Sequence, residues 1–188
     1  MSDKLIESIH YGDRTGLYKV IQTLEKILPE PGVNVTYLCI GSDLSTGDCF
    51  GPLTGTLLHR LGVPGVTGTL DQTVHAKNLV EKISQIPPDD YIVAVDATLG
   101  RIGDVGRLSF INAPLRPGAA MKKDLPPVGH ISVVFNAAPA GFANFLVLGC
   151  ASLNKVWQGA NLLARGIGVV SFRRKKTLTT RTGDGLLS

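Results

Sequence analysis

The sequence lacks several features that mark secreted and membrane proteins. Cysteine occurs only three times, with no pair at CxxC spacing, and the N-terminal segment has no apolar core of a signal peptide. An odd cysteine count without such a leader favours a reducing compartment over a disulfide-bonded domain. The most apolar stretch, residues 137–151, is interrupted by proline, glycine and asparagine and is too short to span a bilayer. We therefore expect a cytoplasmic protein without membrane contact.

Common catalytic motifs are also missing. The chain contains no HExxH, GxSxG, Walker A or GxGxxG sequence, which argues against zinc hydrolases, serine hydrolases and nucleotide-binding enzymes. The four histidines are scattered, so the sequence predicts no metal site and no cofactor. Cys49 precedes a predicted helix, a position that lowers a thiol pKa, but no histidine stands at an informative distance from it. Packing is the preferred role for this cysteine.

Length and composition favour one globular domain. The chain has 188 residues, of which 44% are hydrophobic and 18% charged, enough to bury a full core. We expect a single domain over residues 1–188, with an N-terminal helix segment at 1–32 and a basic C-terminal tail at 173–188. Such a tail can meet nucleic acid or an acidic partner, but a solvated strand end is the favoured interpretation.

Hydrophobic periodicity predicts alternating helices and strands. Their order, together with nearly continuous apolar runs in the strands, is typical of a doubly wound parallel sheet. We therefore predict an α/β fold, a three-layer α/β/α sandwich with a mostly parallel sheet. Residues 97–129, rich in glycine and proline, are expected to form a long loop. The predicted helices are 15–28, 48–61, 74–86 and 142–165, and the predicted strands are 33–40, 66–70, 91–95, 131–135 and 167–172.

Three glycines shape the second predicted helix. Gly47, Gly51 and Gly55 recur at four-residue spacing, which places them on one side of a helix. Because glycine has no side chain beyond Cα, this spacing allows the backbone of helix 48–61 to approach its neighbours closely. We expect the helix to lie against the sheet along this side.

Acidic residues follow three of the four strands that end at the ligand-binding edge of the predicted sheet. These acids are Asp48, Asp71 and Asp96, whereas Asn136 follows the fourth strand. Ligands of open parallel sheets bind beyond the carboxyl ends of the strands. Carboxylates that converge in one cleft can share a proton or hold a metal. When they share a proton, the pKa of one group rises and the other group stays ionised, which is the pairing that amide hydrolysis needs. Asp48 and Asp71 also suit helix capping, but no helix obviously begins after Asp96.

Three segments resemble elements of one protease superfamily. Residues 39–53 look like the strand–loop–helix element of the hydrogenase maturation proteases and the spore germination protease. In these residues a glycine ends the strand, and Asp48 lies three residues before another glycine. Residues 93–97 resemble the second acidic element of that superfamily, and residues 116–125 are similar to a lysine-bearing segment of the germination protease. The chain as a whole most resembles the YyaC family of sporulation proteins from spore-forming bacteria, often described as spore proteases.

The resemblance implies a phosphorylase/hydrolase-like fold of the hydrogenase maturation protease kind. It also implies that Asp48 and Asp96 match the two essential acids. In the germination protease these acids look like an atypical aspartic pair, and in the hydrogenase proteases the matching acids bind nickel together with a histidine. His130 is the candidate histidine of this chain, but its sequence context does not match.

The resulting hypothesis is an endopeptidase-like hydrolase of sporulation or germination. Asp48 and Asp96 would share a proton and activate water. Asp71, Lys122 and Lys123 would contribute to substrate binding, and the lysines would stabilise an oxyanion unless they are merely exposed loop charges. The expected partner is a protein or peptide substrate, and a homo-oligomer is left open.

Two other functions remain open at this point. One is a catalytically inactive protein that keeps the protease fold and binds a peptide or a spore component. The other, which the sequence does not favour, is a nucleic-acid-associated module acting through residues 173–176. Retained acids are necessary for catalysis but do not prove it, so the sequence does not separate the first of these from a peptidase.

Overall fold

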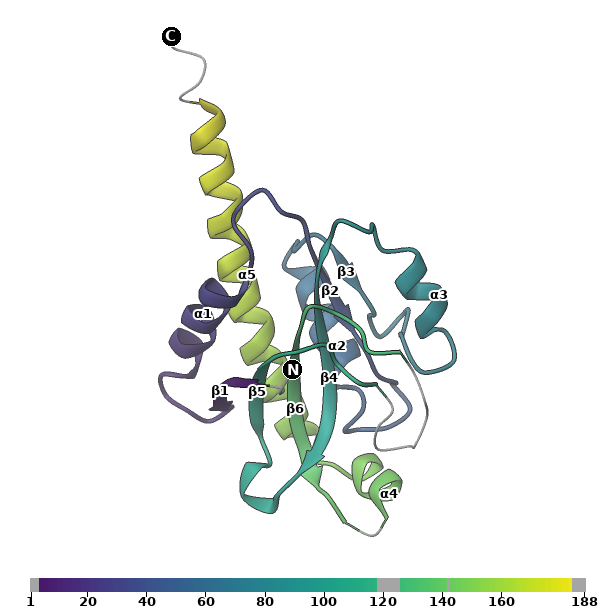
Figure 1. Ribbon diagram of the computed structural model, residues 1–188. Helices are drawn as coiled ribbons and strands as arrows, with labels where there is room; N and C mark the ends of the chain where they lie inside the picture. Colours follow the sequence, from purple (N-terminus) through teal and green to yellow (C-terminus); the bar gives the residue numbers. More distant parts are fainter. Residues whose placement is uncertain (1–3, 118–125, 142, 184–188) are drawn as a thin grey trace.

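The computed structural model describes residues 4–117, 126–141 and 143–183 and contains one six-stranded sheet with helices packed against it (Figure 1). Neighbouring strands follow the order β1-β5-β6-β4-β2-β3. The strands are β1 (Lys4–His10), β2 (Val35–Cys39), β3 (Val66–Thr67), β4 (Tyr91–Gly100), β5 (Arg107–Asn112) and β6 (Ile131–Pro139).

Strand direction confirms the predicted α/β fold with a mostly parallel sheet. Strands β6, β4, β2 and β3 run parallel to one another, and β5 and β1 extend the sheet beyond β6 with antiparallel pairing. Because β2, β4 and β6 point the same way, their carboxyl ends meet at one edge of the sheet. In an open parallel sheet this edge is where ligands bind.

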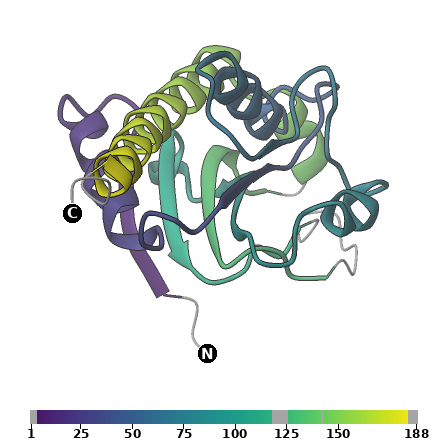
Figure 2. The same cartoon turned by 90° about the horizontal axis from the view of Figure 1, so that it is seen from above.

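Helices lie on both faces of the sheet, as the three-layer prediction requires. On one face, α5 packs against both α1 and α2, and all three cover the strands (Figure 2). Helix α3 packs on the opposite face, where its buried Leu79 contacts a smaller apolar cluster. The helices are α1 (Gly16–Ile27), α2 (Phe50–Arg60), α3 (Leu79–Ser84), α4 (Asn144–Gly149) and α5 (Leu153–Gly183), with a short 3-10 helix, η1 (Ile102–Asp104).

The central strands are buried on both faces, which explains their nearly continuous apolar sequences. In β2, Tyr37 and Cys39 point toward the cluster under α1, α2 and α5, whereas Leu38 contributes to the cluster under α3. In β4, Val95 and Ala94 divide between the two clusters in the same way. This alternation fixes the face on which each residue near the carboxyl ends lies.

Helix α2 lies directly against the strand ends, as the glycine spacing predicts. A Cβ atom at Gly51 would lie 2.0 Å from the carbonyl oxygen of Ile40, and one at Gly55 would lie 1.8 Å from that of Gly68. No other residue type fits at these two positions without movement of the backbone. Gly47 precedes the helix and lies against α4 instead of the sheet.

Helix α5 overturns the prediction of a last strand at residues 167–172. One helix runs from Leu153 to Gly183 and includes both this segment and most of the expected tail. Leu163, Ile167 and Val170 are buried at spacings of four and three residues, so the apolar run forms the inner stripe of a helix. The β-branched residues favour a strand locally, but packing against α1 and α2 decides the outcome.

Two strands were not predicted. Strand β1 precedes α1 within the expected helical segment 1–32, and β5 lies within the expected loop 97–129, as does the end of β4. β1 is an edge strand whose buried hydrophobic residue is Ile9, so its sequence shows little of the alternation that marks a strand. Two other predicted elements are shorter than expected: helix 74–86 contracts to α3 and strand 66–70 to β3.

Candidate acidic site at the carboxyl ends of the strands

Asp96 lies in the carboxyl-terminal half of β4, where the strand leaves the apolar core. It is paired in register with Val134 of β6 and, by strand alternation, lies on the same face as Ala94. The backbone N–H of Ala97 donates a 2.7 Å hydrogen bond to its carboxyl oxygen Oδ1. Burial of the carboxyl raises the pKa of Asp96 well above the ordinary value, and this one hydrogen bond offsets only part of the effect.

Asp48 comes from the loop between β2 and α2. Cys49 occupies the N-cap position of α2, and no side chain caps the helix, so the capping role considered for Asp48 is wrong. Its carboxyl instead accepts a hydrogen bond from the backbone N–H of Ser42 at the start of the same loop. Gly41, with a φ of 145°, allows this fold-back, because a Cβ atom there would lie 2.0 Å from the Asp48 carbonyl oxygen.

The structure brings Asp48 and Asp96 together. Burial is the largest influence on the pKa of Asp96, and the charge of Asp48 raises this pKa further. Burial also raises the pKa of Asp48, but the Ser42 N–H and the charge of His75 counteract it. The pKa values of both acids are thus raised, and that of Asp96 is raised more strongly than that of Asp48.

His75 is a member of the site that the sequence analysis missed. Val74 pairs with Ile40 in an isolated parallel bridge, and its carbonyl oxygen accepts a 2.8 Å hydrogen bond from the N–H of Gly41, so His75 follows at the same edge of the sheet. Its own N–H donates to Asn78 Oδ1 at 2.8 Å, which fixes the backbone there. The sequence analysis missed His75 because no short motif links it to Asp48. Its position became evident only from the pairing of Val74 with Ile40.

His130 does not belong to this site. Its ring stacks on Tyr91 at a centroid distance of 4.6 Å, and its Nδ1 accepts a hydrogen bond from the N–H of Ile92. Both contacts lie at the beginning of β4, whereas Asp96 lies toward the other end. This position agrees with the sequence analysis, in which the residues around His130 did not match those around the histidine of the hydrogenase proteases.

Asn136 lies in the carboxyl-terminal half of β6 and carries a side-chain amide. It pairs in register with Thr98, two residues beyond the pairing of Asp96 with Val134, and therefore lies on the face of the acid pair. A Cβ atom at Gly100 would lie 2.3 Å from Asn136 Oδ1, so the glycine leaves room for this side chain. Within residues 4–117, 126–141 and 143–183, its side-chain amide makes no hydrogen bond and is available to a ligand.

The other predicted substrate-binding residues are not gathered at the pair. Asp71 is exposed in the connection between β3 and α3, and the helix that follows is capped at Asn78, so Asp71 neither caps it nor shifts the pKa of the two acids. Lys122 and Lys123 lie outside the described residues.

Neither a thiol nucleophile nor a metal centre is built at this site in the described part of the chain. Burial raises the pKa of Cys49 to about 11, and its Sγ donates to the Thr46 carbonyl oxygen at 2.9 Å, so the thiol is protonated and engaged. Among the described residues, no three acidic, histidine or cysteine side chains converge as metal ligands. The groups that the structure gathers here are the two acids, with His75 acting on the charge of Asp48.

Comparisons with known proteins agree with the resemblance seen in the sequence. The family described as "Protein of unknown function (DUF1256)" matches residues 8–166. The "Uncharacterized protein YyaC" of Bacillus subtilis (strain 168) is 40% identical over 160 residues, covering 80% of this chain and 77% of that protein. The crystal structure of the NiFe hydrogenase maturation protease HycI from Thermococcus kodakarensis KOD1 matches with a TM-score of 0.52 at 20% identity, covering 74% of this chain and 92% of that chain. At this identity the structural match shows a common fold.

Proposed function

The chain belongs to the family described as protein of unknown function (DUF1256), and we propose that it is a peptidase-like hydrolase acting through Asp48 and Asp96. The observation that carries the proposal is the coupling of these two desolvated carboxyl groups at the carboxyl edge of parallel strands. Such a pair provides an acid and a base at the same pH. The hydrogenase maturation protease fold supports this proposal at the level of architecture.

In the proposed reaction, ionised Asp48 removes a proton from a water molecule as its oxygen attacks the peptide carbonyl carbon. Protonated Asp96 donates a hydrogen bond to the carbonyl oxygen, which becomes the oxyanion of a tetrahedral intermediate. The proton held by Asp48 then passes to the leaving amine as the C–N bond breaks. The products are a carboxylic acid and an amine, and the pair returns to its singly protonated state.

The neighbouring residues suit this division of roles. His75 and the Ser42 N–H favour the ionised form of Asp48, whereas among the described residues the Ala97 N–H is the group that favours the ionised form of Asp96. Asn136 lies on the same face as the pair, where its amide would donate to a substrate carbonyl. These residues would polarise and orient a peptide without a metal ion.

The substrate in this proposal is a protein of sporulation or germination, and the support for it is the resemblance of residues 39–53, 93–97 and 116–125 to the spore germination protease. Asp71, Lys122 and Lys123 remain proposed substrate-binding residues in this scheme, although the described structure gives Asp71 no contact with the pair. A cytoplasmic location of substrate and protein is part of the same proposal.

Cleavage of spore-extract proteins tests this function. Wild-type protein should cleave at least one component, and Asp48→Asn and Asp96→Asn should each reduce the rate by about a hundredfold or more, because each removes one half of the acid–base pair. Asp43→Asn is the matched control, since Asp43 is an exposed acid of the same loop. Parallel reactions with added nickel or a chelator should proceed at the same rate.

Circular dichroism of each variant separates lost chemistry from lost folding. Cleavage that survives in folded Asp96→Asn contradicts the mechanism. Absence of cleavage by the wild type would instead favour a protein that keeps the protease fold and only binds a peptide or spore component.

A further inference from the structure

Helix α5 is positively charged along its whole length. Every charged residue between Leu153 and Gly183 is a lysine or arginine, and the neighbouring helix α2 also contains no acid. The last turns of α5 extend beyond the body of the protein (Figure 1). The cations of α5 are Lys155, Arg165, Arg173, Arg174, Lys175, Lys176 and Arg181.

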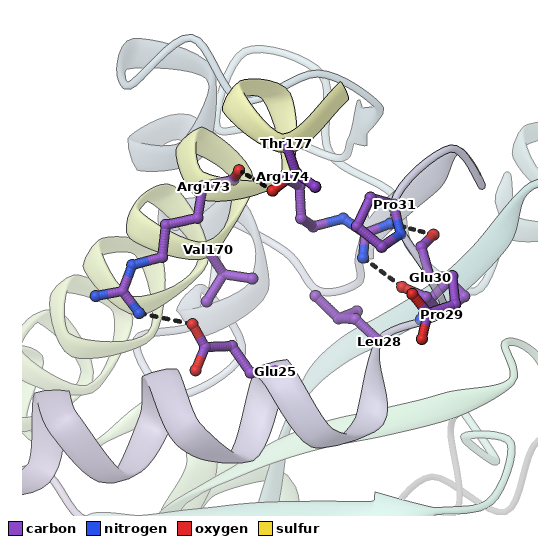
Figure 3. A pocket seen from close by; sticks show the side chains of 9 residues that line it. All are labelled: Glu25, Leu28, Pro29, Glu30, Pro31, Val170, Arg173, Arg174 and Thr177. Carbon is purple, nitrogen blue, oxygen red and sulfur yellow. Dashed lines mark hydrogen bonds and ion pairs between the residues drawn. The ribbon is translucent and has the colours of Figure 1, made fainter. Parts of the chain in front are cut away.

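Two of these cations anchor the helix and leave its other side facing solvent. Arg173 forms a 2.6 Å ion pair with Glu25 of α1, and Arg174 donates to the backbone carbonyl oxygens of Pro29 and Glu30 in the segment after α1 (Figure 3). Both arginines are therefore occupied inside the chain.

The opposite side of α5 combines cations with apolar side chains. Phe172 is 70% exposed, and the exposed Arg165 lies two turns earlier on the same side of the helix. Leu61 at the end of α2 is 55% exposed and adjoins Gly168, where a Cβ atom would approach it within 3.2 Å. Arg60, Leu61, Arg165 and Phe172 define what we name the α2–α5 surface.

The cations of this surface have no internal role in the described structure. Within residues 4–117, 126–141 and 143–183, neither Arg60 nor Arg165 forms an ion pair or a side-chain hydrogen bond. Lys175 and Lys176 are also exposed and add positive charge at the protruding end of α5. The surface therefore presents positive charge and apolar area together to whatever approaches it.

We propose that the α2–α5 surface binds an anionic phospholipid membrane, with α5 lying along the headgroup layer. Cations beside exposed phenylalanine and leucine suit such a layer, because the charges contact lipid phosphates while the apolar side chains enter the acyl boundary. A nucleic-acid backbone would satisfy the arginines but leave Leu61 and Phe172 in water. Charge and apolar exposure together thus favour lipid.

This mode of binding differs from spanning a membrane. No helix in the described part of the chain is long and apolar enough to cross a bilayer. The expectation of no membrane contact was based on the lack of such a segment, which does not address attachment at the surface. The inference is independent of the acid pair and does not require peptidase activity.

Sedimentation of the full chain with vesicles tests the inference. The protein should bind vesicles of phosphatidylglycerol and phosphatidylcholine at low ionic strength, bind poorly to phosphatidylcholine alone, and dissociate as salt is added. Phe172→Ala and Arg165→Gln should each reduce binding to the anionic vesicles several-fold. Tyr18→Ala is the control, because Tyr18 is an aromatic residue of α1 with 61% exposure that lies outside the surface.

Three results would overturn the inference. The first is equal sedimentation with neutral and anionic vesicles, or none with either. The second is anionic vesicle binding that Phe172→Ala and Arg165→Gln both leave unchanged while the variants remain folded. The third is a concentration-dependent dimer, or binding to a DNA duplex, that depends on these residues when vesicle binding is absent.

Discussion

At the residue scale, Asp96 lies in an environment that strongly opposes the charge of its carboxyl group. Its carboxyl is desolvated, lies near the like charge of Asp48 and accepts one backbone hydrogen bond from Ala97. The native protein therefore binds the Asp96 proton more tightly than the unfolded chain does. Since the unfolded chain releases this proton at a lower pH, native stability falls as the pH rises through the interval between the two pKa values.

Asp96→Asn should therefore increase the free energy of unfolding at neutral pH. The amide is uncharged and its Oδ1 can still accept the hydrogen bond from Ala97, so we expect a gain of about 1 kcal/mol or more, which disappears below about pH 4. Urea unfolding of wild type and variant at several pH values measures this difference. Asp43→Asn provides the control, and equal pH dependence in wild type and Asp96→Asn would contradict the raised pKa.

The sequence predicted that Asp48 and Asp96 lie at the same edge of the sheet, but not which residues surround them. Asp48 and Asp96 were predictable because a carboxyl group at the end of an apolar strand of a parallel sheet lies where ligands bind. His75 and Asn136 were not chosen because their roles depend on strand pairing and register, which place Val74 beside Ile40 and Asn136 beside Thr98. The sequence around such a residue does not indicate that the residue lies near the acid pair in the folded protein.

At the scale of single elements, the contact between α2 and β2 should be highly sensitive to added atoms. Gly51→Ala ordinarily favours a helix by about 1 kcal/mol, but here the new Cβ atom would meet the backbone oxygen of Ile40 at 2.0 Å. We expect the clash to dominate and to destabilise the protein by about 2–3 kcal/mol. Gly149→Ala is the matched helical control, because nothing lies within 4 Å of its Cβ position.

Thermal and urea unfolding of these two glycine variants would measure the difference. A stable Gly51→Ala protein would mean that α2 and β2 are less tightly packed than described, and the position of Asp48 would then be less well fixed.

Adjacent arginines of α5 should differ in their contribution to stability. Arg174 donates to several carbonyl oxygens of the segment between α1 and β2, whereas Arg173 forms one exposed ion pair with Glu25 (Figure 3). Arg174→Met should therefore cost about 2 kcal/mol of unfolding free energy, because it removes one partly buried and two exposed hydrogen bonds to backbone carbonyl oxygens. Arg173→Met should cost less than about 1 kcal/mol, and equal losses in urea unfolding would contradict these separate roles.

The elements themselves were predicted unevenly. Helix α1 and the parallel strands were found because their apolar periodicity is regular, with Val20 and Leu24 buried in the helix and Val93 and Val95 in β4. The segment of α5 at residues 167–172 was misassigned because a short apolar run rich in β-branched residues does not distinguish a strand from a buried helical stripe. Contacts with α1 and α2 settle the question in the folded protein.

At the scale of the whole molecule, the order of helices and strands was enough to predict the fold class. It was not enough to predict the antiparallel strands β1 and β5 at one side of the sheet. The pairing of β1 with β5 joins residues 4–10 to residues 107–112. The short exposed sequence of β1 gives no indication of this partner or of its antiparallel direction. The parallel half of the sheet, where the acidic site lies, was easier to predict from the sequence because its strands are apolar runs separated by helices.

The acid pair is itself a property of the whole molecule, because folding joins a loop after β2 to the end of β4. Nuclear magnetic resonance titration of the side-chain carboxyl carbons measures their coupling most directly. We predict that Asp96 retains its proton to higher pH than exposed aspartates do, and that its pKa falls in Asp48→Asn because a neighbouring negative charge is removed. An ordinary pKa for Asp96, or one that Asp48→Asn leaves unchanged, would contradict the proposal that the two acids share a proton.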